Sequence, residues 1–275
     1  MYKELKAFPP PHEEAILWRY MTLEQFIDML ARKSLFFTKA SQFRDDVHEG
    51  FIPEEMEGVF RELIQEHFPD DFTIEQINEI DNENKKYRRN VMCNCWHQNQ
   101  EESMAMWEKY RYRDSGIAIK TTTRNLKKSL SDSRDVYIGK IKYLPLEDYK
   151  ECYRRNFEEI QLRADWKCIY FPFFHKRKAF EYEHEVRIVI DNELHWGENG
   201  RIWRARLDVI PDRPPMSLPE IRSNIGVHVS VDVGTLIDEV IISPYTENWI
   251  PILIKDIVCK YGFEFDVRRS PYVTR

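Results

Sequence analysis

Charged side chains occupy alternate positions between Phe180 and Ile190. In an extended strand, one face of this segment would carry Glu181, Glu183, Glu185 and Arg187. The other face would carry Phe180, Tyr182, His184, Val186, Ile188 and Ile190, so we predict a strand whose apolar members (Phe180, Tyr182, Val186 and Ile188) are buried. A row of carboxylates with one guanidinium is typical either of a solvated surface or of the floor of an active site.

A second candidate is the segment Cys-Asn-Cys-Trp-His, in which Cys93, Cys95 and His97 are two residues apart. Structural zinc sites usually take two cysteines from a turn such as Cys-x-x-Cys, because the turn brings both sulfurs to one metal. On a strand, residues two apart are separated by about 7 Å at Cα. We therefore predict a strand face and no zinc site here.

Two further groups have alternative interpretations. Asp45, Asp46, His48 and Glu49 lie in a predicted loop, which is either a metal- or substrate-binding loop or an ordinary acidic surface. Trp107 and Tyr110 are three apart on a predicted helix, which favours a core pair over a stacking platform. The sequence has no glycine-rich phosphate loop and no nucleophile elbow.

The elements that must position these residues do not alternate regularly between strand and helix. This order predicts an α+β fold with a mixed, mainly antiparallel sheet, flanking helices and a helical insertion near residues 53–89. Thr22 and Gln25 form a capping-box pattern at the start of the first helix. The predicted strands are Ala15–Tyr20, Leu35–Thr38, Val91–His97, Gly116–Thr121, Val136–Tyr143, Phe180–Ile190, Arg201–Ile210, Leu236–Ser243 and Phe263–Arg268. Other predicted helices are Glu101–Tyr110, Glu147–Arg163 and Thr246–Lys260, and Pro211–Pro219 is a predicted loop.

Composition limits the classes of protein. The chain has 275 residues, of which 42% are hydrophobic and 13% aromatic, so it can bury a sizeable core as a single domain over residues 1–275. The net charge of −6 provides no global attraction to nucleic acid or membranes. No apolar run is long enough to span a bilayer, and five cysteines with no secretion signal indicate a reducing, cytoplasmic location.

Several blocks of the sequence resemble a bacterial family catalogued as domain of unknown function 2971. They are Leu17–Leu30, Leu35–Gly50, Cys95–Tyr110, Phe180–Arg187 and Ile241–Trp249, in the family's order. The family's loop is usually closer to Phe-x-Asp-Pro-x-Glu-Gly, whereas this chain has Phe-Arg-Asp-Asp-Val-His-Glu-Gly. The resemblance supplies no activity.

A second, weaker resemblance is to ADP-ribosyltransferases. Their smallest members open with a strand, a threonine, a helix and a short strand, which Trp18–Thr22 and the following residues resemble. Many also carry a Glu-x-Glu pair on a later strand, as Glu183 and Glu185 do. The resemblance implies NAD as donor, an unknown protein or nucleic-acid acceptor, and a role in stress or phage defence.

The same resemblance implies roles for named residues. Glu185 would contact the ribose and stabilise its developing cation, and Glu183 would take a proton from the acceptor. Arg19 and Tyr20 would hold the dinucleotide, with Trp107, Lys176 and Arg187 in the pocket wall.

Two other functions fit the residue pattern. A metal-dependent nuclease or phosphoesterase would use Asp45, Asp46, Glu49 and the Glu183/Glu185 row around Mg²⁺. A non-catalytic binding or regulatory module would present the acidic strand face to a basic partner. A further interpretation gives the row no function: Arg187 pairs with Glu185, and the row is merely structural.

Overall fold

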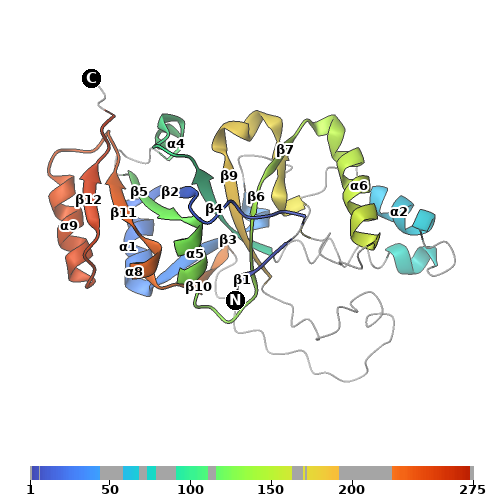
Figure 1. The fold of residues 1–275 in the computed structure, drawn as a ribbon, viewed down its shortest axis with the longest axis horizontal. Coiled ribbons are helices and arrows are strands. Elements are labelled where there is room, and N and C mark those ends of the chain that lie inside the picture. Colours follow the sequence, from blue (N-terminus) through green and yellow to red (C-terminus); the bar gives the residue numbers. More distant parts are fainter. Residues whose placement is uncertain are drawn as a thin grey trace.

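The fold is α+β, with a large mixed and mainly antiparallel sheet (Figure 1). A computed structural model describes residues 2–5, 7–43, 58–67, 73–78, 91–110, 116–162, 170, 172–191 and 225–272. Within these ranges the sheet order is β1-β6-β9-β4-β2-β5-β11-β12, and β3 pairs with β4 and β10. The strands are β1 (Tyr2–Lys3), β2 (Ile16–Thr22), β3 (Ser34–Lys39), β4 (Val91–Gln98), β5 (Gly116–Thr122), β6 (Val136–Lys140), β9 (Glu185–Asp191), β10 (Gly226–Ser230), β11 (Glu239–Ile242) and β12 (Asp266–Arg269). A separate pair joins β7 (Lys142–Leu144) to β8 (His175–Arg177) in parallel.

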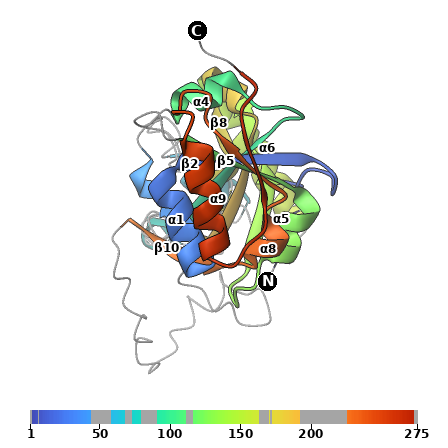
Figure 2. The same cartoon turned by 90° about the vertical axis from the view of Figure 1, so that its left-hand side faces the viewer.

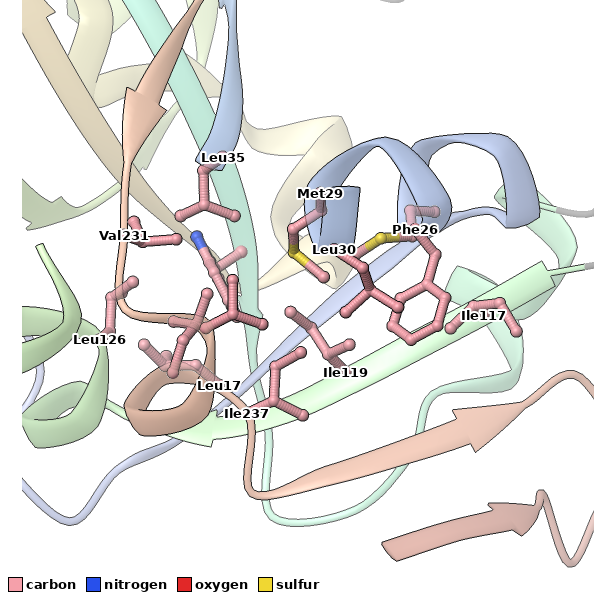
Figure 3. Close-up of a cluster of buried hydrophobic side chains, with 14 of the residues drawn as sticks. Leu17, Phe26, Met29, Leu30, Leu35, Ile117, Ile119, Leu126, Val231 and Ile237 are labelled. Carbon is pink, nitrogen blue, oxygen red and sulfur yellow. The ribbon is translucent and has the colours of Figure 1, made fainter. Parts of the chain in front are cut away.

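One face of the sheet is covered by a continuous aliphatic core. Helices α1 (Leu23–Arg32) and α9 (Ile250–Lys260) pack on it, together with the shorter α5 (Thr123–Ser129) and α8 (Val233–Leu236), as Figure 2 shows. Figure 3 shows Phe26, Met29 and Leu30 of α1 pointing toward Ile119 of β5. The same core includes Val186, Ile188 and Ile190 of β9.

The opposite face carries two separate apolar clusters. The cluster at the β6 end includes Phe8, Tyr137 and Phe174, together with residues of α6 (Tyr149–Leu162) and α2 (Val59–His67). The cluster at the β2–β5–β11 end includes Trp18, Tyr20 and residues of α4 (Met104–Lys109). Polar side chains lie on the strands between the two clusters, so we expect a functional site on this face of the sheet.

Most predicted elements are present, and the Thr22–Gln25 capping box is formed. The predicted strand Val136–Tyr143 is broken after Lys140 into β6 and β7. Of the insertion at 53–89, α2 and residues 74–78 are helical, and its remainder lies outside the described residues. The predicted strand Arg201–Ile210 and the loop Pro211–Pro219 also lie outside them.

The predicted strand Phe180–Ile190 is wrong over its first half. Residues Lys178–Glu183 form a 3₁₀ helix, η5, which ends at His184 in the left-handed conformation (φ 41°). Phe180 is half-buried against the cations of Lys176 and Arg177, and Tyr182 is 48% exposed. Charged and apolar residues alternate with a period of two in the sequence, but the backbone turns at His184, and β9 starts only after this turn. As predicted, β9 lies in the same sheet as the strand ending near Tyr20, and Val186 and Ile188 are buried.

No helix in the described ranges is long and apolar enough to cross a membrane.

The capping box at α1 gives the first prediction. The Thr22 hydroxyl accepts from the Gln25 amide, and the Gln25 side chain accepts from the Thr22 amide. Thr22→Ala removes one acceptor for the helix amides and should lower the free energy of unfolding by about 1 kcal/mol. Urea unfolding of both proteins measures the difference. Thr22→Ser, which keeps the hydroxyl, should change stability by much less, and equal losses in the two variants would contradict the capping role.

Candidate active site

Strands β9 and β4 place the central residues of the candidate site. Along β9, Val186 and its alternate residues face the aliphatic core, so Glu185 and Arg187 face the other way. Antiparallel pairing sets His97 opposite Glu185, and Cys95 opposite Arg187. The two charged side chains are 5% and 0% exposed, so they are not a solvated row.

Three cations hold the two carboxylates in what we call the ion cluster: Lys109, Lys176, Glu183, Glu185 and Arg187. Arg187 donates to Oε1 of Glu185 from Nε at 2.7 Å and from Nη2 at 2.6 Å. Lys176 Nζ lies 2.8 Å from Oε2 of Glu183 and 3.3 Å from Oε2 of Glu185. Lys109 Nζ lies 2.8 Å from the other oxygen of Glu183. Both oxygens of Glu183 therefore accept from ammonium groups.

Backbone groups complete the hydrogen bonding of the ion cluster. Arg187 Nη1 donates to the carbonyl of Phe173 at 2.9 Å, and its guanidinium lies 5.2 Å from the ring centre of Phe43. The Tyr143 hydroxyl accepts from the Glu185 amide at 2.8 Å. Buried charges cost several kcal/mol unless they are paired and hydrogen-bonded. This site meets that requirement with residues from separate segments.

Glu185 is ionised at neutral pH. Burial raises the pKa of its carboxyl, but the charges of Arg187 and Lys176 outweigh desolvation and, with a hydrogen bond from Cys95, lower the pKa to about 2. The bond from Lys176, at 3.3 Å, is longer than the bonds of 2.6 and 2.7 Å from Arg187, and long, weak bonds are the easiest to exchange for a ligand hydroxyl.

His97 lies beside the ion cluster and is 2% exposed. Its Nδ1 is 2.6 Å from the backbone carbonyl of Glu183, which accepts a hydrogen bond and so fixes the proton on Nδ1. Its Nε2 is buried and finds no hydrogen-bond partner among the residues that the structure describes, and a buried polar group without a partner costs about 1–3 kcal/mol. Burial lowers the pKa of the imidazole more than the Glu183 carbonyl raises it, and His184 lowers it further. The ring is therefore neutral at pH 7, with a lone pair on Nε2.

Aromatic rings line the other side of His97. Tyr20 is edge-on to Trp107 at 4.8 Å between centroids, stacked on Tyr110 at 6.3 Å, and 6.1 Å from His97. The Tyr20 hydroxyl accepts from the Ser103 amide at 2.8 Å, which fixes its position. Burial raises the pKa of Tyr20 well above its usual range and that of Tyr110 to about 12, so both phenols are neutral. Trp107 is 1% exposed, which confirms the prediction that it is a core residue.

Arg19 lies where strands β2 and β4 stop pairing. Leu17 pairs with Gln98 and Trp18 with His97, and the pairing of the two strands ends after Trp18. Arg19 is half-buried and donates from Nη1 to the carbonyl of Cys95 at 2.8 Å, in place of a further strand bond. The guanidinium is thus held near Tyr110, which also contributes to its electrostatic environment.

The structure brings most of the predicted site residues together. Glu183, Glu185, Lys176 and Arg187 share the ion cluster, and Tyr20 and Trp107 connect to it through His97. Glu181 does not join them, because it is exposed and pairs with Lys178 at 2.6 Å. Asp45, Asp46, His48 and Glu49 lie outside the described residues.

Sequence reasoning missed three members of this site. They are Lys109, Tyr143 and His97 as a hydrogen-bonding residue. Each joins the site through a contact with a distant segment of the chain, which no local pattern predicts. The spacing of two between His97 and Cys95 marked a common strand face, but register alone shows that this face meets Glu185. Within the described ranges no group of three or more His, Cys, Asp or Glu side chains is arranged to hold a metal ion, and the prediction of no zinc at Cys93, Cys95 and His97 stays a prediction.

The lowered pKa of Glu185 predicts acid sensitivity. Its stabilising charge is fully present above the ordinary pKa of 4.5 and is lost as the pH falls toward 2. Wild-type stability should therefore drop by about 3 kcal/mol more than that of Glu185→Gln over this range, from the size of the shift. At pH 7, Glu185→Gln should cost about 3–5 kcal/mol, because Arg187 is left buried without its partner.

Urea unfolding at steps between pH 6 and pH 2 tests this expectation. Glu181→Gln is the matched control, since its exposed pair with Lys178 should contribute about 0–1 kcal/mol. Parallel pH curves for wild type and Glu185→Gln would show that Glu185 is not the residue that titrates.

Comparison with known proteins matches part of the chain to a protein family. Neither the search of curated proteins nor the search of solved structures finds a similar protein. The matched part runs from α4 to β9 and includes Lys109, Lys176 and the Glu183–Arg187 segment, but not the N-terminal blocks or the Ile241–Trp249 block. Over residues 106–188 the chain is similar to a family described as protein of unknown function (DUF2971).

Proposed function

We propose that this protein transfers ADP-ribose from NAD to an acceptor. The observation that carries the proposal is the ionised Glu185, fixed at the start of β9 opposite His97, whose ring lies 6.1 Å from that of Tyr20. Cleavage of the bond between nicotinamide and ribose builds positive charge on the sugar, and a carboxylate held in place stabilises that charge without reorganising. The acceptor is a protein or a nucleic acid.

The surroundings of Glu185 support its role. Arg187 and Lys176 keep the carboxylate ionised at neutral pH and orient it. Tyr110, which is only partly buried and stacks on the buried Tyr20, is the ring of this aromatic group that is open to a planar ring of the dinucleotide. Arg19, held against the Cys95 carbonyl, supplies a positive charge for its phosphates.

The alternatives have less support. A nuclease that uses the Glu183/Glu185 pair for Mg²⁺ needs carboxylates with free oxygens, but both are bound by cations. A module that recognises a basic partner needs an exposed acidic face, but Glu183 and Glu185 are 4% and 5% exposed. Both observations favour an enclosed polar site over a charged docking face.

Loss of the Glu185 charge tests the proposal. Glu185→Gln should lower NAD turnover by about 10²- to 10³-fold, as for the loss of a preorganised electrostatic group. Glu181→Gln, with its exposed side chain, should leave turnover unchanged. The assay measures nicotinamide release, and transfer of labelled ADP-ribose to protein, DNA and RNA, with the melting temperature as a folding control.

Two results would count against the transferase. One is the absence of NAD consumption by wild type with every acceptor, including water. The other is equal turnover in wild type and Glu185→Gln. If Glu185→Gln does not fold, the double variant Glu185→Gln/Arg187→Met takes its place in the assay. It replaces both charged side chains of the pair by neutral ones, and such replacements of buried pairs are often tolerated.

Binding provides an independent measurement. A ligand present at about 100 times its Kd stabilises the folded state by about 2.7 kcal/mol. NAD should therefore raise the melting temperature of the wild type, whereas Mg²⁺ and Mn²⁺ should not. Stabilisation by the metals without NAD would favour the nuclease instead.

A further inference from the structure

We infer that His97, through Nε2, is the residue that accepts the proton of the attacking nucleophile. The inference rests on the proposed function and deepens it, because resemblance alone gives this role to Glu183. It starts from two contacts of Glu183. Its carboxylate oxygens accept from Lys109 and Lys176, and its backbone carbonyl accepts from His97.

The hydrogen bond to the carbonyl prepares the imidazole. Because a carbonyl can only accept, Nδ1 carries the proton and Nε2 presents a lone pair. Both carboxylate oxygens of Glu183 are engaged by ammonium groups, so neither is open to the hydroxyl of an acceptor. Within the described residues, the Nε2 atom has no hydrogen-bond partner at all, and a buried polar atom left in this way needs an explanation. A donor from the substrate explains it.

The position of His97 suits proton transfer. It lies opposite Glu185 across the β4–β9 pairing, so the base and the charge that stabilises the sugar are adjacent. His184 lies edge-on to the imidazole at 6.1 Å, is exposed, and has a positive φ, which is uncommon for residues other than glycine. Conformational strain of this kind gathers at functional sites. An exposed, strained residue therefore lies against the buried ring, where a ligand would approach.

The transfer breaks one bond to the ribose and forms another. The bond between the nicotinamide nitrogen and ribose C1′ breaks, and its electron pair leaves with nicotinamide. A lone pair of the acceptor oxygen forms the new bond to C1′. The acceptor proton passes to Nε2 of His97, which later releases it to solvent. With water as acceptor, the products are ADP-ribose, nicotinamide and one proton.

The decisive variant is His97→Asn, because the asparagine amide can still donate to the Glu183 carbonyl but has no group at the Nε2 position. Nicotinamide release from NAD should fall by about 10²- to 10⁴-fold, the usual contribution of a general base, while the melting temperature is kept. Glu183→Gln, which retains the backbone carbonyl, should lose less than about tenfold. The reverse ranking, or a His97→Asn variant within tenfold of wild type, overturns the assignment to His97.

The pH profile separates a base from a structural residue. Wild-type turnover should rise with pH through a pKa below the ordinary histidine value of 6.5. Charged or titratable groups that face His97 are Tyr20 on β2, Glu183 and His184 at the turn, and Glu185 on β9. Glu181→Gln is the matched control, because its exposed side chain pairs with Lys178 outside the ion cluster, and it should keep both turnover and the rise with pH. His184→Asn, in which asparagine tolerates the positive φ, should keep the rise but move it to higher pH, because His184 lowers the pKa of His97. If His97→Asn does not fold, the pH profiles of Glu183→Gln and His184→Asn decide. A rise of turnover with pH in both variants supports His97 as the base, and loss of that rise in either variant overturns the assignment.

A measurement without NAD makes the two proposals separable. Nitrogen NMR of the free protein at pH 7.5 should show His97 protonated at Nδ1 and not at Nε2. A proton on Nε2 overturns the inference whatever the activity. No NAD consumption by wild type removes the transferase, and the role of His97 with it, whereas wild-type turnover with an active His97→Asn variant removes only the role of His97.

Discussion

The buried pairing of Glu185 with Arg187 is the interaction on which the rest of the site depends. Both charges lie on one strand, two residues apart, and neither would be tolerated there alone because of the cost of desolvation. Pairing also leaves further donors and acceptors to be satisfied, and these come from Lys176 on β8, Tyr143 on β7 and the carbonyl of Phe173. The ion pair therefore requires the small β7–β8 sheet to sit against β9.

The two faces of the main sheet have different roles: one provides most of the hydrophobic core, and the other holds the polar site. One face carries a continuous aliphatic core with α1, α5, α8 and α9, and burial of that apolar surface is the main favourable term in folding. The other face is split into two apolar clusters with the ion cluster and His97 between them. Since stability comes mainly from the first face, the second can hold polar groups that are costly to bury, including the Nε2 of His97, which has no partner in the described part of the chain.

The sequence predicts the strand and its two faces better than it predicts the site. Alternation correctly places Val186 and Ile188 in the core and Glu185 with Arg187 on the opposite face, because a period of two is a local property. It fails at Phe180–Glu183, where the side chains alternate but the backbone turns through a left-handed His184. Lys109 is 74 residues from Glu183, and the pairing of His97 with Glu185 depends on register, so neither contact follows from a local pattern.

The turn at His184 explains how Glu183 contacts both the imidazole of His97 and the two lysine ammonium groups. If residues 183–185 were extended, the side chain of Glu183 would simply repeat that of Glu185 along the same face. The turn instead points the Glu183 carbonyl at His97 while its carboxylate reaches Lys109 and Lys176. The position of the ammonium groups and the tautomer of the imidazole are thus set by the same residue, through its side chain and its backbone respectively. Because a backbone carbonyl survives any substitution of the side chain, the orientation of His97 depends on the turn and not on the glutamate.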